Sequence, residues 1–209
     1  MKVLIADDHD VVRKGLKQIL TDEFEAVDFG EAGDAAELLE RVWKEKWDLV
    51  LVDINMPGRS GLEALVELKK KRPKLPVLVL SMFSEKEYAR RALKAGAAAY
   101  LSKQSLGREL VAAIRKVLAG GRYITPTLAE LLAADLGKNE TKPPHEQLSD
   151  REYEVMKLIA AAKSVKEIAN ELCLGEKTVF TYRARLLEKL GLKSDVEVAR
   201  YALQHRLVD

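Results

Sequence analysis

Five short apolar runs recur in the first 120 residues, with helical patterns between them. Three of these runs are continuous and rich in Val and Leu, which is typical of strands covered on both faces of a parallel sheet. The predicted strands are Val3–Ala6, Val27–Phe29, Leu49–Val52, Val77–Leu80 and Ala97–Leu101. Apolar residues spaced by three and four predict helices over Val11–Thr21, Asp34–Lys46, Gly61–Lys71, Glu85–Ala95 and Leu106–Ala119. Residues 1–121 are therefore predicted to form a doubly wound α/β domain with a five-stranded, flavodoxin-like sheet.

The pattern weakens after this domain and then changes to purely helical. Residues 122–146 are interpreted as a linker, because residues 137–144 are polar and rich in Gly and Pro. Within this linker, Thr127–Leu136 has the spacing of one short helix. Residues 147–209 then predict a small domain of four helices.

Capping signals mark where several of these helices begin. Asp34 and Ser84 are predicted N-caps in the first domain. In the last domain, the Ser-x-x-Glu sequences that start at Ser149, Ser164 and Ser194 predict three capping boxes. The remaining helix, Glu176–Leu190, is predicted to start after Gly175, a weaker cap.

Composition excludes several classes of protein. With 47% hydrophobic and 33% charged residues, the 209-residue chain can build a core, and its charge is too dispersed for a membrane protein. Asp7 and Asp8 interrupt the apolar start too soon for a signal peptide, so a cytoplasmic location is expected. The single cysteine, Cys173, cannot form an internal disulfide and is interpreted as a small packing residue beside a turn. The net charge is only +2, but opposite local patches can average to such a value.

Polar residues follow the predicted strands at their carboxyl ends, where an open parallel sheet binds ligands. They are Asp7, Asp8, Asp53, Ser81 and Lys103. Crowded carboxylates repel one another, and a hard divalent cation with oxygen ligands neutralises them, Mg²⁺ rather than Ca²⁺ because the ligands are few. A metal, a lysine, a hydroxyl and an acceptor carboxylate are the groups that phosphoryl transfer needs, and the carboxylate can itself be the nucleophile. His9 is interpreted as a structural neighbour of the acidic pair rather than as a base.

These residues resemble the response regulators of two-component signalling, of the NarL/FixJ type. The motifs that carry the resemblance are Leu4-Ile5-Ala6-Asp7-Asp8-His9, Asp53-Ile54-Asn55-Met56-Pro57-Gly58-x-x-Gly61, Leu80-Ser81-Met82 and Gly96-x-x-x-Tyr100-Leu101-x-Lys103. The resemblance implies that a sensor histidine kinase phosphorylates Asp53. It also implies that Asp8, Asp53 and the Asn55 carbonyl bind Mg²⁺, with Asp7 assisting through water. Lys103 would pair with the phosphoryl group, and Ser81 and Tyr100 would relay its presence.

The segment Ser164–Leu190 has the arrangement of a helix-turn-helix. Residues 177–193 carry five basic side chains and one acidic side chain, which favours contacts with DNA phosphates, although charge runs are also common on solvated faces. One side of the second helix is apolar and would dock on its neighbours. The predicted DNA contacts lie largely on the other side and comprise Lys177, Thr178, Phe180, Thr181, Arg183, Ala184, Arg185 and Lys189. Phe180 could equally tuck into an adjacent helix.

This part of the chain is similar to the LuxR-type DNA-binding domain over about 60 residues. The matching motifs are Leu148-Ser149-x-Arg151-Glu152-x-Glu154-Val155, Lys166-Glu167-Ile168-Ala169-x-x-Leu172 and Lys177-Thr178-Val179-x-x-Tyr182-Arg183-x-x-Leu186-x-x-Lys189-Leu190-Gly191. The sequence thus predicts a transcription regulator that binds double-stranded DNA, pairs into a homodimer and has no membrane partner. The last helix is a candidate dimer surface, and packing within its own domain is the alternative.

Two other classes of function stay open. A Mg²⁺-dependent aspartyl-phosphate hydrolase shares the predicted sheet, but such enzymes carry Asp-x-Asp after the first strand, where this chain has Asp7-Asp8-His9. A regulator that acts through protein contacts without phosphate is the second. We expect no enzymatic turnover beyond self-dephosphorylation of the phosphoryl acceptor.

Overall fold

The computed structural model describes residues 1–82, 85–136, 143–205 and 207–208. The chain forms two compact units, residues 1–138 and residues 139–209. Among the described residues, no helix is both long enough and apolar enough to cross a membrane.

The first unit is built on a five-stranded parallel sheet in the order β2-β1-β3-β4-β5. The strands are β1 (Lys2–Ala6), β2 (Asp28–Ala32), β3 (Leu49–Asp53), β4 (Val77–Ser81) and β5 (Ala99–Ser102). The chain runs from β1 outward to β2 and then returns to β3, so the direction of winding reverses between β1 and β3. This confirms the predicted doubly wound fold, and it puts a ligand crevice at the carboxyl ends of β1 and β3.

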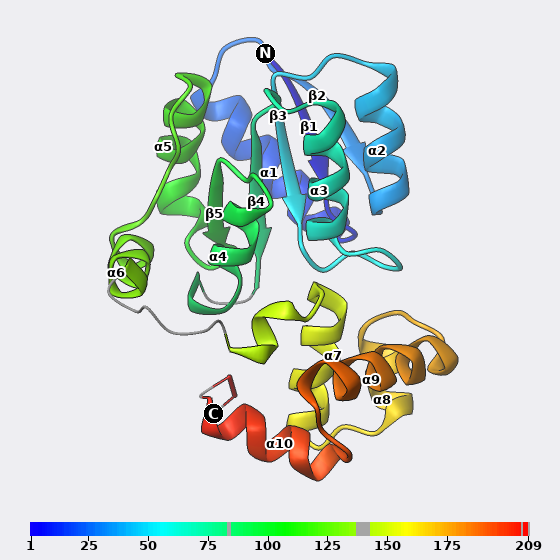
Figure 1. Ribbon diagram of the computed structural model, residues 1–209. Coiled ribbons are helices and arrows are strands. Elements are labelled where there is room, and N and C mark those ends of the chain that lie inside the picture. The colour runs from blue at the N-terminus through cyan, green and yellow to red at the C-terminus, as the bar shows by residue number, and fades with distance from the viewer. Residues whose placement is uncertain (83–84, 137–142, 206, 209) are drawn as a thin grey trace. The chain divides into compact units, whose positions relative to one another are not determined.

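Helices cover both faces of this sheet (Figure 1). α1 (Asp10–Glu23) and α5 (Leu106–Leu118) lie on one face, while α2 (Ala35–Lys44), α3 (Gly61–Lys71) and α4 (Glu85–Lys94) lie on the other. Alternate strand residues such as Ile5, Leu51 and Leu80 join the core beneath α1 and α5. Their sequence neighbours are equally buried against the opposite layer. Double coverage is the reason that the strand sequences are continuously apolar.

Strand boundaries differ from the predicted ones at the edges of the sheet. β2 extends to Ala32, through Gly30 and Glu31, because its backbone pairs with β1 whatever the polarity of its side chains. Gly30 leaves room for the Trp47 ring, which lies 2.2 Å from where a Cβ at residue 30 would stand. Asp34 caps α2 as predicted, since its carboxylate accepts from the backbone N–H groups of Ala36 and Glu37 at 2.8 Å. The other predicted cap, Ser84, lies outside the described residues.

The short helix predicted inside the linker is present as α6 (Pro126–Leu136). It packs on α4 and so belongs to the first unit. Most of the breaker-rich stretch that follows, residues 137–142, lies outside the described part of the chain.

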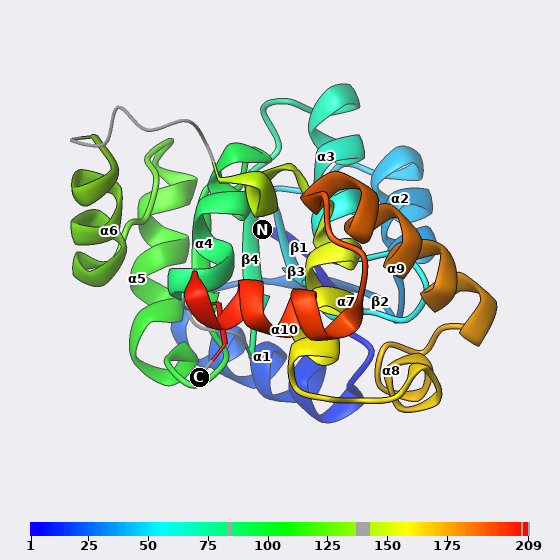
Figure 2. The same ribbon diagram turned by 60° about the horizontal axis from the view of Figure 1, so that its bottom comes forward.

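The second unit contains a 3₁₀ helix, η1 (Pro144–Gln147), and four α-helices, α7 (Asp150–Ala160), α8 (Val165–Glu171), α9 (Glu176–Leu190) and α10 (Asp195–Gln204). α7 packs against both α9 and α10, and α8 packs against α9 (Figure 2). The capping boxes at Ser149 and Ser164 are complete. The third is half formed, because Glu197 accepts from the backbone N–H of Lys193 rather than from that of Ser194.

Candidate functional site: an acidic pocket and a helix-turn-helix face

The structure brings Asp7, Asp8, Asp53 and Lys103 together at the carboxyl edge of the sheet. β1 ends one residue before Asp7, β3 ends at Asp53, and Lys103 directly follows β5. The Lys103 ammonium lies 2.7 Å from a carboxylate oxygen of Asp7 and 2.7 Å from one of Asp53. Asp7 and Asp53 are almost fully buried, whereas the Asp8 side chain is 29% exposed. One lysine thus bridges two buried carboxylates.

Burial and the neighbouring charges compete at this pocket. Burial raises the pKa of Asp53 to about 6, although the Lys103 ammonium opposes the rise. Burial acts to lower the pKa of Lys103, but the carboxylates of Asp53 and Asp7 outweigh it and hold that pKa above its ordinary value. At pH 7 to 8 Asp53 is therefore mostly ionised and Lys103 is charged.

The donor set suits a hard cation. Ligand atoms of Asp7, Asp8, His9 and Asp53 lie within 4.8 Å of one another. The second carboxylate oxygen of Asp53, Oδ1, is buried and has no hydrogen-bond partner among the described residues, and the same holds for the side-chain oxygen of Asn55. Buried oxygens without donors carry a desolvation cost that a bound cation would remove. The residues present therefore fit Mg²⁺.

The two residues that are expected to relay phosphorylation, Ser81 and Tyr100, are both buried. Ser81 is fully buried at the end of β4, and its backbone carbonyl accepts from the Lys103 N–H at 2.7 Å. Tyr100 is also fully buried, two residues before Ser102 on β5. His9 remains exposed, with its Nδ1 2.7 Å from an Asp8 carboxylate oxygen. Its position as a neighbour of the acidic pair matches the sequence interpretation.

Two residues that shape this pocket were not singled out for it in the sequence. Gly61 opens α3 where a Cβ would stand only 1.9 Å from the Asp53 carbonyl oxygen. The guanidinium of Arg13 donates to the Asp7 carbonyl oxygen at 2.7 Å and ties α1 to the end of β1. Gly61 is part of the Asp53 motif and could have been noted there; Arg13 carries no comparable signal.

In the second unit, α9 presents a basic and hydroxyl-bearing face. Lys177, Thr178, Thr181, Tyr182 and Arg185 line a shallow depression of about 370 Å³ on this face. The opposite side of α9 is docked through Val179, Leu186 and Leu190, which are buried. Tyr182, which was not among the predicted contacts, lies on the same face at helical spacing from Thr178. The Phe180 side chain is 54% exposed, so it does not tuck into a neighbouring helix.

Two of the predicted DNA contacts are held by partners inside the unit. Arg183 pairs with Asp195 at 2.7 Å, and Lys189 pairs with the buried Glu152 at 2.6 Å. The interpretation of Cys173 as a packing residue was wrong. It is exposed, with a φ of +51°, because the tight turn between α8 and α9 needs a left-handed residue at this point.

The last helix, α10, was interpreted either as a dimer surface or as packing within its own domain. Val198 and Ala202 are buried, and α10 packs on α7. Val196 and Leu203 point outward, with 78% and 57% of their surfaces exposed. Packing within the domain accounts for one face of α10 and leaves the other available.

A doubly wound domain with a lysine-bridged acidic pocket, followed by a helix-turn-helix unit, defines the class of two-domain transcription regulators with a receiver. Residues 3–115 match the family described as response regulator receiver domain, and residues 146–202 match bacterial regulatory proteins of the luxR family. The chain belongs to the response regulators that combine these two domains.

Known proteins support this assignment over the whole chain. The response regulator GacA of Pseudomonas aeruginosa is 40% identical to this chain. The alignment covers 100% of this chain and 98% of the GacA chain. The structure of RcsB from Salmonella enterica serovar Typhimurium, bound to promoter rprA in the presence of the phosphomimetic BeF₃⁻, is similar with a TM-score of 0.62 and 28% identity; the match covers 96% of this chain and 98% of that chain. A structure of two RcsB dimers bound to two parallel DNAs has a TM-score of 0.59 and 27% identity, with 96% of each chain covered.

Proposed function

We propose that Asp53 is the phosphoacceptor and that a sensor histidine kinase is its phosphoryl donor. The observation that carries the proposal is the position of Lys103, which bridges Asp7 and Asp53. The buried Asp53 Oδ1 has no hydrogen-bond partner among the residues that the structure describes. In the proposed step, Asp53 Oδ1 forms a bond to phosphorus while the bond from phosphorus to the kinase histidine nitrogen breaks. The product is an aspartyl phosphate, and no turnover beyond its own hydrolysis is proposed.

The residues around Asp53 would each have a separate part. Asp8, Asp53 and the Asn55 carbonyl would hold Mg²⁺, with Asp7 assisting through water. When bound, the cation would neutralise charge on the phosphoryl oxygens. Lys103 would turn from the Asp53 carboxylate to the phosphoryl group, because phosphorylation converts that carboxylate into the uncharged acyl part of a mixed anhydride and moves the negative charge outward to the phosphoryl oxygens.

The phosphoryl group would then be read by Ser81 and Tyr100. The Ser81 hydroxyl would donate a hydrogen bond to it, and the space that Ser81 leaves would admit the Tyr100 ring. We infer that this change promotes pairing of two protomers and DNA binding by α9, placing two α9 helices about 34 Å apart on successive turns of the duplex. DNA complexes and dimers of RcsB support this inference. A protein that regulates transcription by binding DNA would be located in the cytoplasm.

Phosphorylation can be tested with acetyl phosphate and Mg²⁺. We expect one phosphoryl group per chain in intact-protein mass spectra, and none in the Asp53→Ala variant. Asp10→Ala removes a neighbouring exposed carboxylate and should be labelled like the parent. Full labelling of Asp53→Ala would refute the assignment, and steady release of phosphate over many turnovers would favour a hydrolase.

The link to DNA needs its own measurement at a fixed salt concentration. Selection from a random duplex pool would supply a binding site, and anisotropy would compare affinities with and without phosphorylation. We expect tighter binding and a dimer after phosphorylation. Equal affinity in both states would instead favour a regulator that acts without phosphate.

A further inference from the structure

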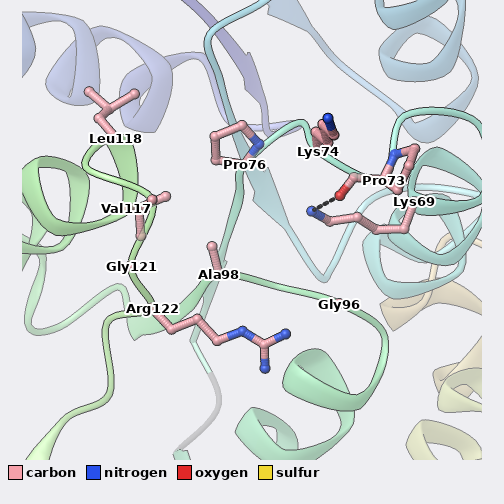
Figure 3. A pocket seen from close by; sticks show the side chains of 11 residues that line it. Lys69, Pro73, Lys74, Pro76, Gly96, Ala98, Val117, Leu118, Gly121 and Arg122 are labelled. Carbon is pink, nitrogen blue, oxygen red and sulfur yellow. Dashed lines mark hydrogen bonds between the residues drawn. The ribbon is translucent and has the colours of Figure 1, made fainter.

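The first unit contains a second pocket, at the edge of the sheet opposite Asp53. It has a volume of about 550 Å³, within the range of about 300 to 1,000 Å³ that is common for small-molecule sites. Its walls come from the end of α3, the loop between α3 and β4, the turn before β5 and the segment that leaves α5 (Figure 3). The proposed function makes no use of this pocket.

The charge of the pocket is of one sign. Lys69, Lys74 and Arg122 line it, and none of the described residues that line it is acidic. Lys69 and Arg122 extend toward each other from opposite walls in Figure 3. Lys74 and Arg122 form neither an ion pair nor a side-chain hydrogen bond within the described part of the chain. Two cations thus face this space without a counter-ion.

Helix ends explain Lys69 but not the other two cations. Cations are favourable near helix C-termini, and Lys69 lies in the last turn of α3. Its ammonium donates to the carbonyl oxygen of Leu75 at 2.6 Å, and its stem packs on Gly96. Burial and repulsion by Arg122 lower the pKa of Lys69. Lys74 and Arg122 lie outside the helices, so that no helix terminus accounts for them.

We propose that this pocket binds a small phosphate-bearing anion, with its phosphate held by Lys74, Arg122 and Lys69. An arginine fork and two ammonium groups supply the charge-assisted donors that phosphate oxygens accept. The remaining part of the ligand would lie against Pro76, Val117 and Leu118, which form the apolar wall.

The place of Arg122 in the chain gives such binding a consequence. Arg122 lies in the middle of the segment that leads from α5 to α6. The next residue, Tyr123, donates its N–H to the Ala98 carbonyl oxygen at 3.0 Å. A phosphate shared by Arg122 and Lys74 would tie this segment to the loop between α3 and β4. The ligand would therefore stabilise the attachment of the exit segment to the sheet.

The test uses the full chain in EDTA and at constant ionic strength, so that a bound cation at Asp53 plays no part. Calorimetric titrations would compare adenosine 5′-monophosphate, inorganic phosphate and uncharged adenosine. We expect saturable binding of the phosphate-bearing probes and none of adenosine. Tighter binding of the monophosphate would assign an organic phosphate as ligand, and equal binding would assign phosphate alone.

Variants of matched charge decide whether the pocket is responsible. Lys74→Gln/Arg122→Gln should weaken binding about tenfold or more, because it removes two charge-assisted contacts with the phosphate. Both side chains are exposed, and neither forms an ion pair or a side-chain hydrogen bond with a described residue. Lys70→Gln/Arg72→Gln removes two neighbouring exposed cations outside the pocket and should bind like the parent. Asp53→Ala should also bind like the parent, which separates this proposal from phosphorylation. Equal loss in both double variants, or no saturable binding by the parent, would overturn the proposal.

Discussion

The Asp53 pocket depends on a single position where no side chain fits. At Gly61, α3 begins against the backbone of the residue that we propose is phosphorylated, and its N–H donates to the Ile54 carbonyl oxygen at 2.9 Å. A methyl group there would have to displace the Asp53 carbonyl oxygen, which is backbone and cannot rotate away. The start of α3 would then move away from β3.

We therefore expect Gly61→Ala to lower the free energy of unfolding of the first unit by about 1 to 3 kcal/mol. Its labelling by acetyl phosphate should slow as well, because Asp53 shifts. Gly15→Ala is the matched control: it lies inside α1 with nothing within 4 Å of the new methyl group and should be neutral or stabilising by up to about 1 kcal/mol. Chemical denaturation measures both variants. Equal stability of Gly61→Ala and the parent would contradict the close contact.

At the scale of elements, α9 serves both the core and the proposed DNA face. Arg185 and Lys177 lie on the exposed face with other polar side chains, whereas Arg183 and Lys189 are paired within the unit. Substituting Arg183 or Lys189 would therefore disturb folding as well as binding. A substitution of Arg185, which lies on the exposed face, should change DNA binding without changing folding.

Arg185→Ala should weaken DNA binding and lower the slope of log affinity against log salt by about 1, because one phosphate contact is lost. Its thermal stability should match that of the parent. Arg72→Ala removes the same charge from an exposed position in the first unit and should leave DNA binding unchanged. Anisotropy titrations at several salt concentrations give the slope. An unchanged slope would remove Arg185 from the interface.

The contact between α7 and α9 includes the ion pair of Glu152 and Lys189, whose contribution to stability depends on pH. Burial would raise the pKa of Glu152, but the Lys189 ammonium and the Ser149 N–H outweigh it and hold that pKa below its ordinary value of 4.5. A carboxyl group whose pKa is lower in the folded protein than in the unfolded chain stabilises the folded protein at any pH above its pKa in the unfolded chain. This stabilisation is lost as the pH falls through the pKa of the group in the folded protein.

Lys189→Met should therefore destabilise the second unit by about 1 kcal/mol at pH 7, a modest value because Lys189 is partly exposed. The difference from the parent should shrink as the pH falls through the lowered pKa of Glu152, because protonation of this carboxyl group removes its charge. Urea denaturation at pH 7 and pH 3.5 checks both statements. A difference that is independent of pH would indicate lost packing of the lysine stem instead.

In the whole molecule, each of the two compact units has its own core, so a ligand that binds one unit should stabilise that unit alone. Calorimetry of the full chain should show two unfolding transitions, and Mg²⁺ should raise the midpoint of one only. At a hundredfold excess over its dissociation constant, a ligand adds about 2.7 kcal/mol to the stability of the unit that binds it. Asp53→Asn should lose most of this shift and Asp10→Asn should keep it. A shift of both transitions would show that the units do not unfold independently.

The sheet, the order of the helices and the acidic edge could be predicted from the amino-acid sequence, because they follow from local periodicity and from the rule that parallel strands end at one edge. The two domain types could be predicted because their motifs resemble known families. Cap residues such as Asp34 and Ser149 also act within one turn of chain, so their sequence signals sufficed.

Which charged side chains are paired inside the protein, and which remain exposed, became clear only from the packing of the helices. Lys189 and Glu152 are 37 residues apart, and a charge on a helix looks the same in sequence whether it faces DNA or a buried carboxylate. The approach of Arg122 to Lys69 and Lys74 likewise joins segments that are distant in the chain. Such contacts depend on how helices pack on the sheet, which local patterns do not encode.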